Sequence, residues 1–246
     1  MKANQGKTEI LIVNTRNIKT ERIKIKVVEK GKTKMLTPSK SIKVLGIMID
    51  EKFNWKKQIL YVKKHATNTI RKLHRINPLL PVEIRIQLYL SLVVPHFDYC
   101  DVIWGGCTVE SARKLQVTQN FAVRSLTGAK KHESASESFA KLKFLNLSQR
   151  RKIHEVVFAH KSLSHSNPNE INEMYVKQCP TSNTRSATSA ILNYPSHKTQ
   201  KYQTGPFYRT IQSWNSVPNH ISANTTTKAF KNEFQRHTIK TTYSQN

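Results

Sequence analysis

Acidic residues are scarce in this chain of 246 residues. Only 15 Asp and Glu stand against 41 Lys and Arg, which gives a formal net charge of +26 and a pI near 10.2. Positive charges in that excess repel one another when the protein has no anionic partner. Binding a polyanion such as nucleic acid is favourable, because each phosphate that the protein neutralises releases condensed counterions. Nucleic acid is therefore the favoured partner. An anionic membrane surface and a merely solvated basic surface are the alternatives. Residues 1–80 carry 20 of the Lys and Arg and 5 acids, so we expect the binding surface there.

Cysteine, glycine, proline and long apolar runs are also scarce. The three cysteines, Cys100, Cys107 and Cys179, form an odd set, and the first residues contain no apolar signal core. Both observations predict a reducing intracellular compartment, nuclear or cytoplasmic. The longest apolar runs, such as residues 88–94, are too short to span a membrane. Without Gly or Pro enrichment the chain is neither a linker nor collagen-like. We expect an intracellular protein without a membrane segment, and the oligomeric state stays open.

Several kinds of catalytic or metal site are missing from the sequence. It contains no Asp-Asp pair, no Cys-x-x-Cys, no Gly-x-Ser-x-Gly and no glycine-rich phosphate loop. His96 and Cys100 are four residues apart and Cys107 follows, but Pro95 is expected to interrupt the helix that would carry them. Packing in the core is therefore favoured over a zinc site. We likewise expect Tyr89, Trp104 and Trp214 to be packing residues.

Short strands are predicted in the first fifty residues. Residues 9–13 form a compact apolar run, and Ile23, Ile25 and Val27 alternate with basic residues. A turn is expected at residues 30–32, followed by another strand over residues 41–49. Together they predict a small antiparallel sheet with one cationic face.

Helices are predicted from Asn54 onward. The first has an apolar stripe formed by Ile59, Val62, Ala66, Ile70 and Leu73. Its other sides carry basic residues, namely Lys56, Lys57, Lys63, Lys64, Arg71 and Lys72. After a break at Asn77-Pro78, a second helix opens at Pro81 and uses Ile84, Leu88 and Leu92 until Pro95. A third runs from about Val109 to a glycine cap at Gly128.

The second half is predicted to hold further helices separated by a polar stretch. Residues 137–142, 148–163 and 229–238 have helical patterns, and regular structure of unassigned type is expected around residues 207–214. Residues 164–205 are rich in Ser, Asn, Thr and Lys, which predicts loop or disorder. The fold class expected is α+β, mainly helical.

Six blocks of sequence occur in an order that is typical of one family. The most specific is LYLSLVVPHFDYC at residues 88–100 with VIWG at 102–105. Before it stand NQGKTE at residues 4–9 and VLGI at 44–47, followed by Asp50 and FNW at 53–55. Three groups come after it. The first has LQ at 115–116, QN at 119–120 and Arg124, and the second has Leu145, Leu147 and RR at 150–151. The last has WN at 214–215, Pro218, Ile221 and FK at 230–231.

These blocks resemble the C-terminal end of a LINE-type, jockey-like non-LTR retrotransposon reverse transcriptase. The resemblance implies a palm remnant with the primer-grip hairpin at residues 1–54 and a helical thumb at 55–128. It implies a helical connector at 129–165 and a partly disordered C-terminal region with the Trp-Asn motif at 166–246. In that family the thumb holds the template–primer duplex, and Leu45 and Gly46 correspond to the primer grip. Gly46 lacks a Cβ, so backbone can approach a nucleic-acid strand closely.

One departure decides which activity the resemblance implies. The family uses paired aspartates to hold Mg²⁺ ions, and those motifs would precede the first residue of this chain. We expect no catalytic residue, no metal and no cofactor here, although Lys7 could serve as an accessory proton donor in a complete enzyme. The predicted function is sequence-independent binding of RNA or an RNA–DNA duplex through Lys56, Lys57, Lys63, Lys64, Arg71, Lys72, Leu45 and Gly46. The alternatives are an inert transposon relic and an exapted, non-catalytic RNA-binding protein.

Overall fold

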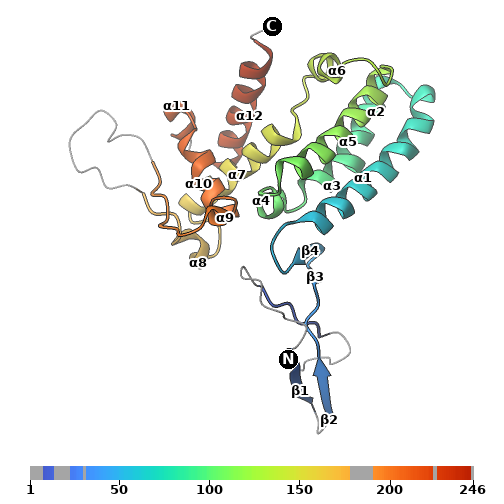
Figure 1. Cartoon of the computed structure of the whole chain (residues 1–246). Coiled ribbons are helices and arrows are strands. Elements are labelled where there is room, and N and C mark those ends of the chain that lie inside the picture. The colour runs from blue at the N-terminus through green and yellow to red at the C-terminus, as the bar shows by residue number, and fades with distance from the viewer. Residues whose placement is uncertain (1–7, 14–22, 30–31, 178–190, 224–225, 245–246) are drawn as a thin grey trace, which may run out of the picture. The chain divides into compact units, whose positions relative to one another are not determined.

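The computed structural model describes residues 8–13, 23–29, 32–177, 191–223 and 226–244. The chain is mainly helical, with two small antiparallel sheets of two strands each (Figure 1). Internal contacts divide it into residues 1–62 and residues 63–246. The α+β class predicted from the sequence is confirmed at this level.

The first hairpin joins β1 (Ile25–Glu29) to β2 (Lys32–Leu36). The strands pair from Ile25 opposite Leu36 to Glu29 opposite Lys32, so the predicted alternation does mark a strand. Of the turn predicted at residues 30–32, residues 30 and 31 lie outside the described residues, and Lys32 is the first residue of β2. The strand predicted at residues 9–13 is wrong, because that run has no regular structure. It is held instead by an isolated backbone bond, in which the Ser39 N–H donates to the Ile10 carbonyl at 2.8 Å.

The second hairpin corrects the single strand predicted at residues 41–49. β3 (Ser41–Val44) and β4 (Ile47–Asp50) pair with each other through a two-residue turn at Leu45-Gly46. Both turn residues have positive φ, 46° and 89°. That combination defines the tight turn whose twist matches antiparallel strands. Apolar character alone could not reveal the reversal, because Leu45 is an unusual residue for a left-handed position.

Helix α1 (Lys56–Ile76) forms as the apolar stripe predicts. Ile59, Val62, Ala66, Ile70 and Leu73 are all buried, and the six predicted basic residues are all exposed. Beyond residue 62 the helix packs on its neighbours through polar contacts as well. The His74 Nδ1 lies 2.7 Å from the Ser125 Oγ, and the buried Asn77 amide donates to the Ser125 carbonyl at 3.0 Å.

The segment after α1 differs from its prediction. A short turn, η2 (Asn77–Leu79), leads through Pro81 to α2 (Val82–Leu88), a π-helical turn η3 (Tyr89–Val93) and α3 (Val94–Asp98). Pro95 does not interrupt the helix, because it occupies the first turn of α3 after a wide turn in which the Val94 N–H donates to the Tyr89 carbonyl.

The π-helical turn also changes which side of this segment is buried. Tyr89, Val93 and Phe97 face the core, whereas Ile84 and Leu92 are exposed. The apolar stripe predicted at 84, 88 and 92 is therefore wrong, because it assumed one continuous helical period.

Three further helices complete this part of the chain. α4 (Asp101–Trp104) is short, α5 (Val109–Thr127) ends at Gly128 in the left-handed conformation as predicted, and α6 (Ala135–Leu142) packs on α5. Val123, Ala135 and Phe139 form a small core between α5 and α6.

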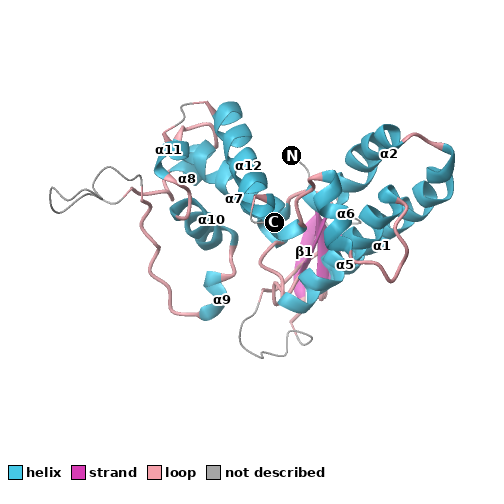
Figure 2. Ribbon diagram, turned by 90° about the horizontal axis from the view of Figure 1, so that it is seen from above, coloured by secondary structure: helices cyan, strands magenta, loops and turns pink. Residues whose placement is uncertain are grey.

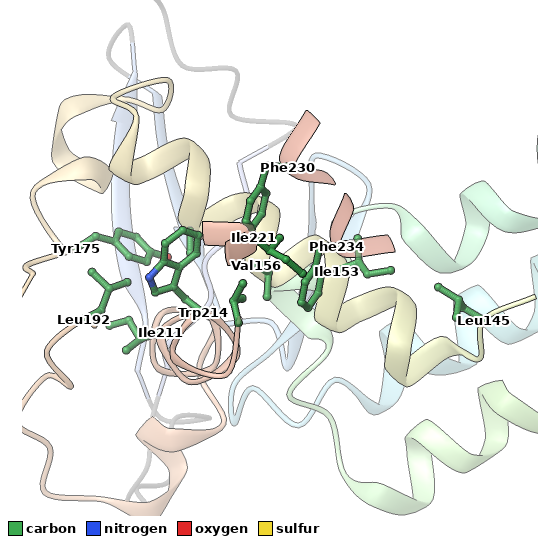
Figure 3. Close-up of a cluster of buried hydrophobic side chains, with 12 residues drawn as sticks. Leu145, Ile153, Val156, Tyr175, Leu192, Ile211, Trp214, Ile221, Phe230 and Phe234 are labelled. Atoms are coloured by element: carbon green, nitrogen blue, oxygen red, sulfur yellow. The ribbon is translucent and has the colours of Figure 1, made fainter. Parts of the chain in front are cut away.

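The last helices form a second core around α7 (Leu147–Leu163). α10 (Pro206–Asn215) and α12 (Thr227–Tyr243) lie against it, as Figure 2 shows, and α11 (Asn219–Ser222) adds Ile221. Trp214, Phe230 and Phe234 fill the centre of this cluster (Figure 3). The C-terminal Trp-Asn region is therefore packed on α7 and shares one core with it.

The polar stretch at residues 164–205 is mostly loop, with two short helices, α8 (Asn169–Asn172) and α9 (Gln200–Gln203). Its ends are nevertheless anchored, since Tyr175 and Leu192 are buried in the second core and Lys177 pairs with Leu192. The centre of the predicted disorder, residues 178–190, lies outside the described residues.

Candidate nucleic-acid interface

The basic side of α1 is the largest group of predicted binding residues. The helix carries seven Lys and Arg and no Asp or Glu. Lys57, Lys64 and Arg71 recur every seven residues, so they form a row with about 10 Å between neighbours. The buried Val62, Ala66 and Leu73 lie on the opposite side. None of the seven cations forms an ion pair with an acid in the part of the chain that the structure describes.

The first turn of α1 carries positive side chains at the N-terminus of the helix, a position where positive charge is unfavourable. Lys56 and Lys57 occupy the first turn, and no acidic residue accompanies them there. Because the N-terminus of a helix carries a partial positive charge, cations at this end cost stability and an anion bound there gains it. The two lysines at this end of α1 therefore reduce the stability of the isolated helix but strengthen the binding of an anionic ligand.

Asp50 and Glu51 are the acids closest in sequence to this cationic turn, and the carboxylate of Asp50 is already occupied. One oxygen accepts from the backbone N–H groups of Lys52 and Asn54, both at 3.0 Å, and the other accepts from Trp55 at 2.9 Å. These bonds fix the loop between β4 and α1. The Gln58 Oε1 adds a bond from the Met48 N–H at 2.9 Å, which ties the second hairpin to the same helix.

The predicted primer-grip residues lie at the tip of the second hairpin. Leu45 is 86% exposed, and Gly46 provides the second positive φ of the turn. Lys57 Nζ donates to the Ser41 Oγ at 2.6 Å, and Lys43 Nζ lies 5.0 Å from the centre of the Tyr61 ring. The structure thus joins β3 to the first turns of α1 and brings two lysines to that junction. Lys7 lies outside the described residues.

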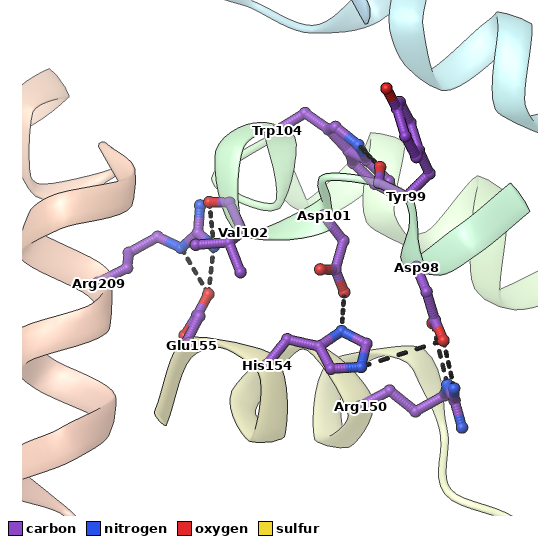
Figure 4. Close-up of polar contacts among 9 residues, drawn as sticks. All are labelled: Asp98, Tyr99, Asp101, Val102, Trp104, Arg150, His154, Glu155 and Arg209. Atoms are coloured by element: carbon purple, nitrogen blue, oxygen red, sulfur yellow. Dashed lines mark hydrogen bonds and ion pairs between the residues drawn. The ribbon is translucent and has the colours of Figure 1, made fainter. Parts of the chain in front are cut away.

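A polar network ties α3 and α4 to α7 and was not predicted (Figure 4). The Arg150 guanidinium pairs with Asp98, and the His154 Nδ1 lies 2.7 Å from a carboxylate oxygen of Asp101. The other ring nitrogen of His154 lies 4.0 Å from Asp98. Burial raises the pKa of the Asp101 carboxyl, although its bond to His154 acts in the opposite direction.

The same network contains a possible set of metal ligands. One atom each from Asp98, Asp101 and His154 lies within 4.8 Å of the others. A cation there would have to displace Arg150 from Asp98, and the guanidinium would repel it. We therefore assign the network a structural role. His96 contacts Thr69 at 3.4 Å, and among the described residues neither it nor Cys100 nor Cys107 joins a cluster of potential ligands.

The residues predicted to be packing anchors are buried. Trp104 is fully covered, and its Nε1 donates to the Tyr99 carbonyl at 2.8 Å. Tyr89 accepts a bond from the buried Gln119 amide at 3.3 Å, and desolvation raises the pKa of its hydroxyl to about 12. Trp214 lies in the second core. The interpretation of these three residues as packing anchors is confirmed.

Two arginines at a second site escaped the sequence analysis as functional candidates. In the sequence Arg151 stands out only as part of an Arg-Arg motif, and no pattern marks Arg209. The structure brings them together, since both line one pocket with Cys107. Arg209 pairs with Glu155, which is 54 residues away in sequence. The doubled arginine was the one available signal, and it did not indicate a partner.

Comparisons of the chain with protein-family models, curated proteins and solved structures give no match. None of the described helices is both long enough and apolar enough to cross a membrane.

Proposed function

We propose that this protein binds RNA or an RNA–DNA duplex through the phosphate backbone, without sequence preference, and that α1 is its principal contact. The observation that carries the proposal is the division of α1 into a buried apolar side and an exposed side with seven cations and no acid. Phosphate contacts by Lys and Arg position a nucleic acid without reading its bases. An A-form duplex suits such contacts, because its accessible groove presents phosphates and 2′-hydroxyls more than base identity.

We further propose that the chain derives from the C-terminal end of a non-LTR reverse transcriptase, with a palm remnant followed by a thumb. The support is the order of the sequence blocks between residues 4 and 231. In such an enzyme the activity is RNA-templated DNA synthesis with Mg²⁺. The chain has no Asp-Asp pair, so we propose that it binds template and primer but does not extend them alone.

The salt dependence of binding tests the first proposal. We expect the logarithm of the association constant for a 20-base-pair RNA–DNA duplex to fall linearly with the logarithm of the salt concentration in a filter-binding assay. The triple variant Lys57→Gln, Lys64→Gln and Arg71→Gln removes the row on α1. Its slope is expected to be smaller in magnitude by about 2 to 3, because each lost phosphate contact removes about 0.9.

A matched variant controls for net charge. Lys141, Lys161 and Lys231 are exposed residues of α6, α7 and α12, and changing all three to Gln removes the same charge elsewhere. This control is expected to keep a slope close to that of the wild type. Equal losses in both triple variants would show that binding follows total charge alone, and binding that does not respond to salt would refute a phosphate-driven interaction.

A further inference from the structure

A pocket of about 700 Å³ lies between four elements of the second unit. The first turns of α5 and α7 line it, together with the loop after α4 and one side of α10. The N-terminal turns of α5 and α7, which carry the positive ends of the helix dipoles, therefore both border this pocket. This volume falls within the range of pockets that hold small organic ligands.

The charge of the lining is unbalanced. Four cationic residues and one carboxylate face the pocket: Arg113, Arg151, Lys152, Arg209 and Glu155. The single carboxylate is already engaged, because the Arg209 Nε donates to Glu155 at 3.0 Å and the Ser213 Oγ donates to it at 2.6 Å. Three cationic side chains are thus left without a counter-charge from the lining.

Arg151 is the least satisfied of these groups. Only 8% of the residue is exposed, and its guanidinium lies over the Trp104 ring at 5.0 Å. Its buried Nε and Nη2 have no hydrogen-bond partner among the described residues, and neither has the buried Nη1 of Arg209. Burial lowers the pKa of Arg151, which reflects the cost of desolvating its charge. Buried donors without acceptors are rare in folded proteins, because each one costs free energy.

The backbone beside the arginines leaves room for them. A Cβ at Gly105 would lie 2.7 Å from the Arg209 Nη2 and 3.3 Å from the Arg151 Cδ. A Cβ at Gly106 would lie 2.8 Å from the Arg209 Nη1 and 1.8 Å from the Thr204 carbonyl oxygen. Both positions therefore need glycine for the guanidinium groups to approach this closely. Arg209 is also held by Glu155 and by the Val102 carbonyl, to which its Nη2 donates at 3.3 Å.

We propose that this pocket binds a phosphate monoester through Arg151 and Arg209. A dianion offsets two of the three uncompensated charges, and a guanidinium fork matches phosphate oxygens in geometry and in hydrogen-bond donors. Val109, Ala112 and Leu147 supply apolar lining for the organic part of the ligand. The inference shares no residue with the nucleic-acid surface of α1 and does not depend on it. The monoester is either a small phosphorylated compound or the phosphorylated end of a nucleic-acid strand.

Cys107 provides a direct reporter, because its thiol lines the same pocket. In a chain that carries Cys100→Ser and Cys179→Ser, the rate of alkylation of Cys107 by iodoacetamide is measured against inorganic phosphate, with chloride at equal ionic strength as reference. We expect phosphate to slow alkylation at least threefold at saturation. Uridine 5′-monophosphate is expected to do so at lower concentration, because it also fills the apolar part.

Variants connect the protection to the arginine. Arg151→Gln is expected to weaken the apparent phosphate affinity by about tenfold or more, because it removes a charge-assisted donor fork. Arg151→Lys keeps the positive charge but loses the guanidinium fork, so its apparent phosphate affinity is expected to lie between those of the wild type and Arg151→Gln. Lys161→Gln, an exposed cation of the same helix, is expected to leave the affinity unchanged. Circular dichroism and the unfolding midpoint establish that each variant is folded.

Two oligonucleotides separate the possible sources of the monoester. One carries a 5′-phosphate, and the other has the same sequence with a 5′-hydroxyl. Protection by the phosphorylated strand alone assigns the pocket to strand ends, whereas protection by uridine 5′-monophosphate and by neither strand assigns it to small compounds. If phosphate, the nucleotide and the phosphorylated strand all fail to slow alkylation of the wild-type pocket, the proposal is wrong. Equal protection in Arg151→Gln and Lys161→Gln would also overturn it. Neither result depends on the variants of α1.

Discussion

At the scale of single residues, buried charges are concentrated on one helix. Arg150, Arg151, His154 and Glu155 follow one another on α7, and each contacts a different partner. Arg150 pairs with Asp98 and His154 is in hydrogen-bond contact with Asp101, so each of these groups has a polar partner. Arg151 lies over an aromatic ring and has two donors without acceptors. Arg150 therefore belongs to a structural ion-pair network, whereas Arg151, the next residue, belongs to a candidate binding site.

The buried Asp101 makes stability depend on pH in a direction that can be measured. Burial raises the pKa of its carboxyl, while His154 and Arg151 oppose the shift and Asp98 adds to it. The folded protein therefore holds this proton to a higher pH than the unfolded chain does. Its contribution to the free energy of unfolding is greatest below the unfolded pKa of about 4 and declines as the pH rises through the folded pKa.

Asp101→Asn removes this titration and keeps the size of the side chain. We expect the difference in unfolding free energy, wild type minus variant, to fall as the pH rises above about 4. Urea denaturation at closely spaced pH values between about 3.5 and 6.5 measures it. A difference that instead grows with pH would mean that the ionic bond to His154 outweighs the burial of the carboxylate.

At the scale of elements, the end of α5 offers a test of one local rule. Gly128 follows the helix with φ of 75°, and nothing lies within 4 Å of where a Cβ would be placed. Gly128→Ala therefore adds backbone strain without a steric clash and is expected to lower the unfolding free energy by about 1 kcal/mol. Gly128→Asn is expected to lose less, because Asn tolerates this conformation better.

Chemical denaturation with both variants measures the effect as a shift in midpoint at an unchanged slope. A loss in Gly128→Ala far above that in Gly128→Asn, accompanied by a changed slope, would indicate that the end of α5 rearranges. The prediction would then be wrong about the cause, because strain at one residue leaves the rest of the helix in place.

How far the sequence predicts each element follows from the range of the interactions that form it. The stripe of α1 is local and periodic, so its helix and its buried side were both predicted. The chain reversal at Leu45 was not predicted, because no sequence pattern indicates an exposed leucine at positive φ. Pro95 was taken as a helix end, because a π-helical turn that accommodates it is rare and has no clear sequence signal.

The candidate sites divide in the same way. The cations of α1 are visible in the sequence because they belong to one helix. The second site depends on Arg209 and Glu155, which are 54 residues apart, and on two glycines beside them. Such contacts arise only when the second core brings α10 onto α7, so no local pattern could have predicted the pocket.

At the scale of the whole molecule, the net charge of +26 acts on folding and on binding with opposite signs. Self-repulsion among excess cations destabilises the compact state, and salt screens that repulsion. Salt also reduces the entropy gained when counterions are released from a bound nucleic acid. Raising the salt concentration should therefore strengthen the fold and weaken the proposed complex in the same preparation.

We expect the thermal unfolding midpoint to rise between about 50 and 500 mM NaCl. Over the lower part of that range the affinity for an RNA–DNA duplex is expected to fall with a logarithmic slope of about −5, if the six predicted basic residues of α1 each contact a phosphate. Differential scanning fluorimetry and filter binding measure the two quantities on one protein sample. If affinity and stability fell together, loss of folded protein would explain the weaker binding and the salt slope would carry no information about phosphate contacts. Sodium phosphate at matched ionic strength adds a comparison between variants. Phosphate also raises the midpoint through its exclusion from the protein surface, so occupation of the Arg151 pocket is measured as the part of the rise that Arg151→Gln loses and Lys161→Gln keeps.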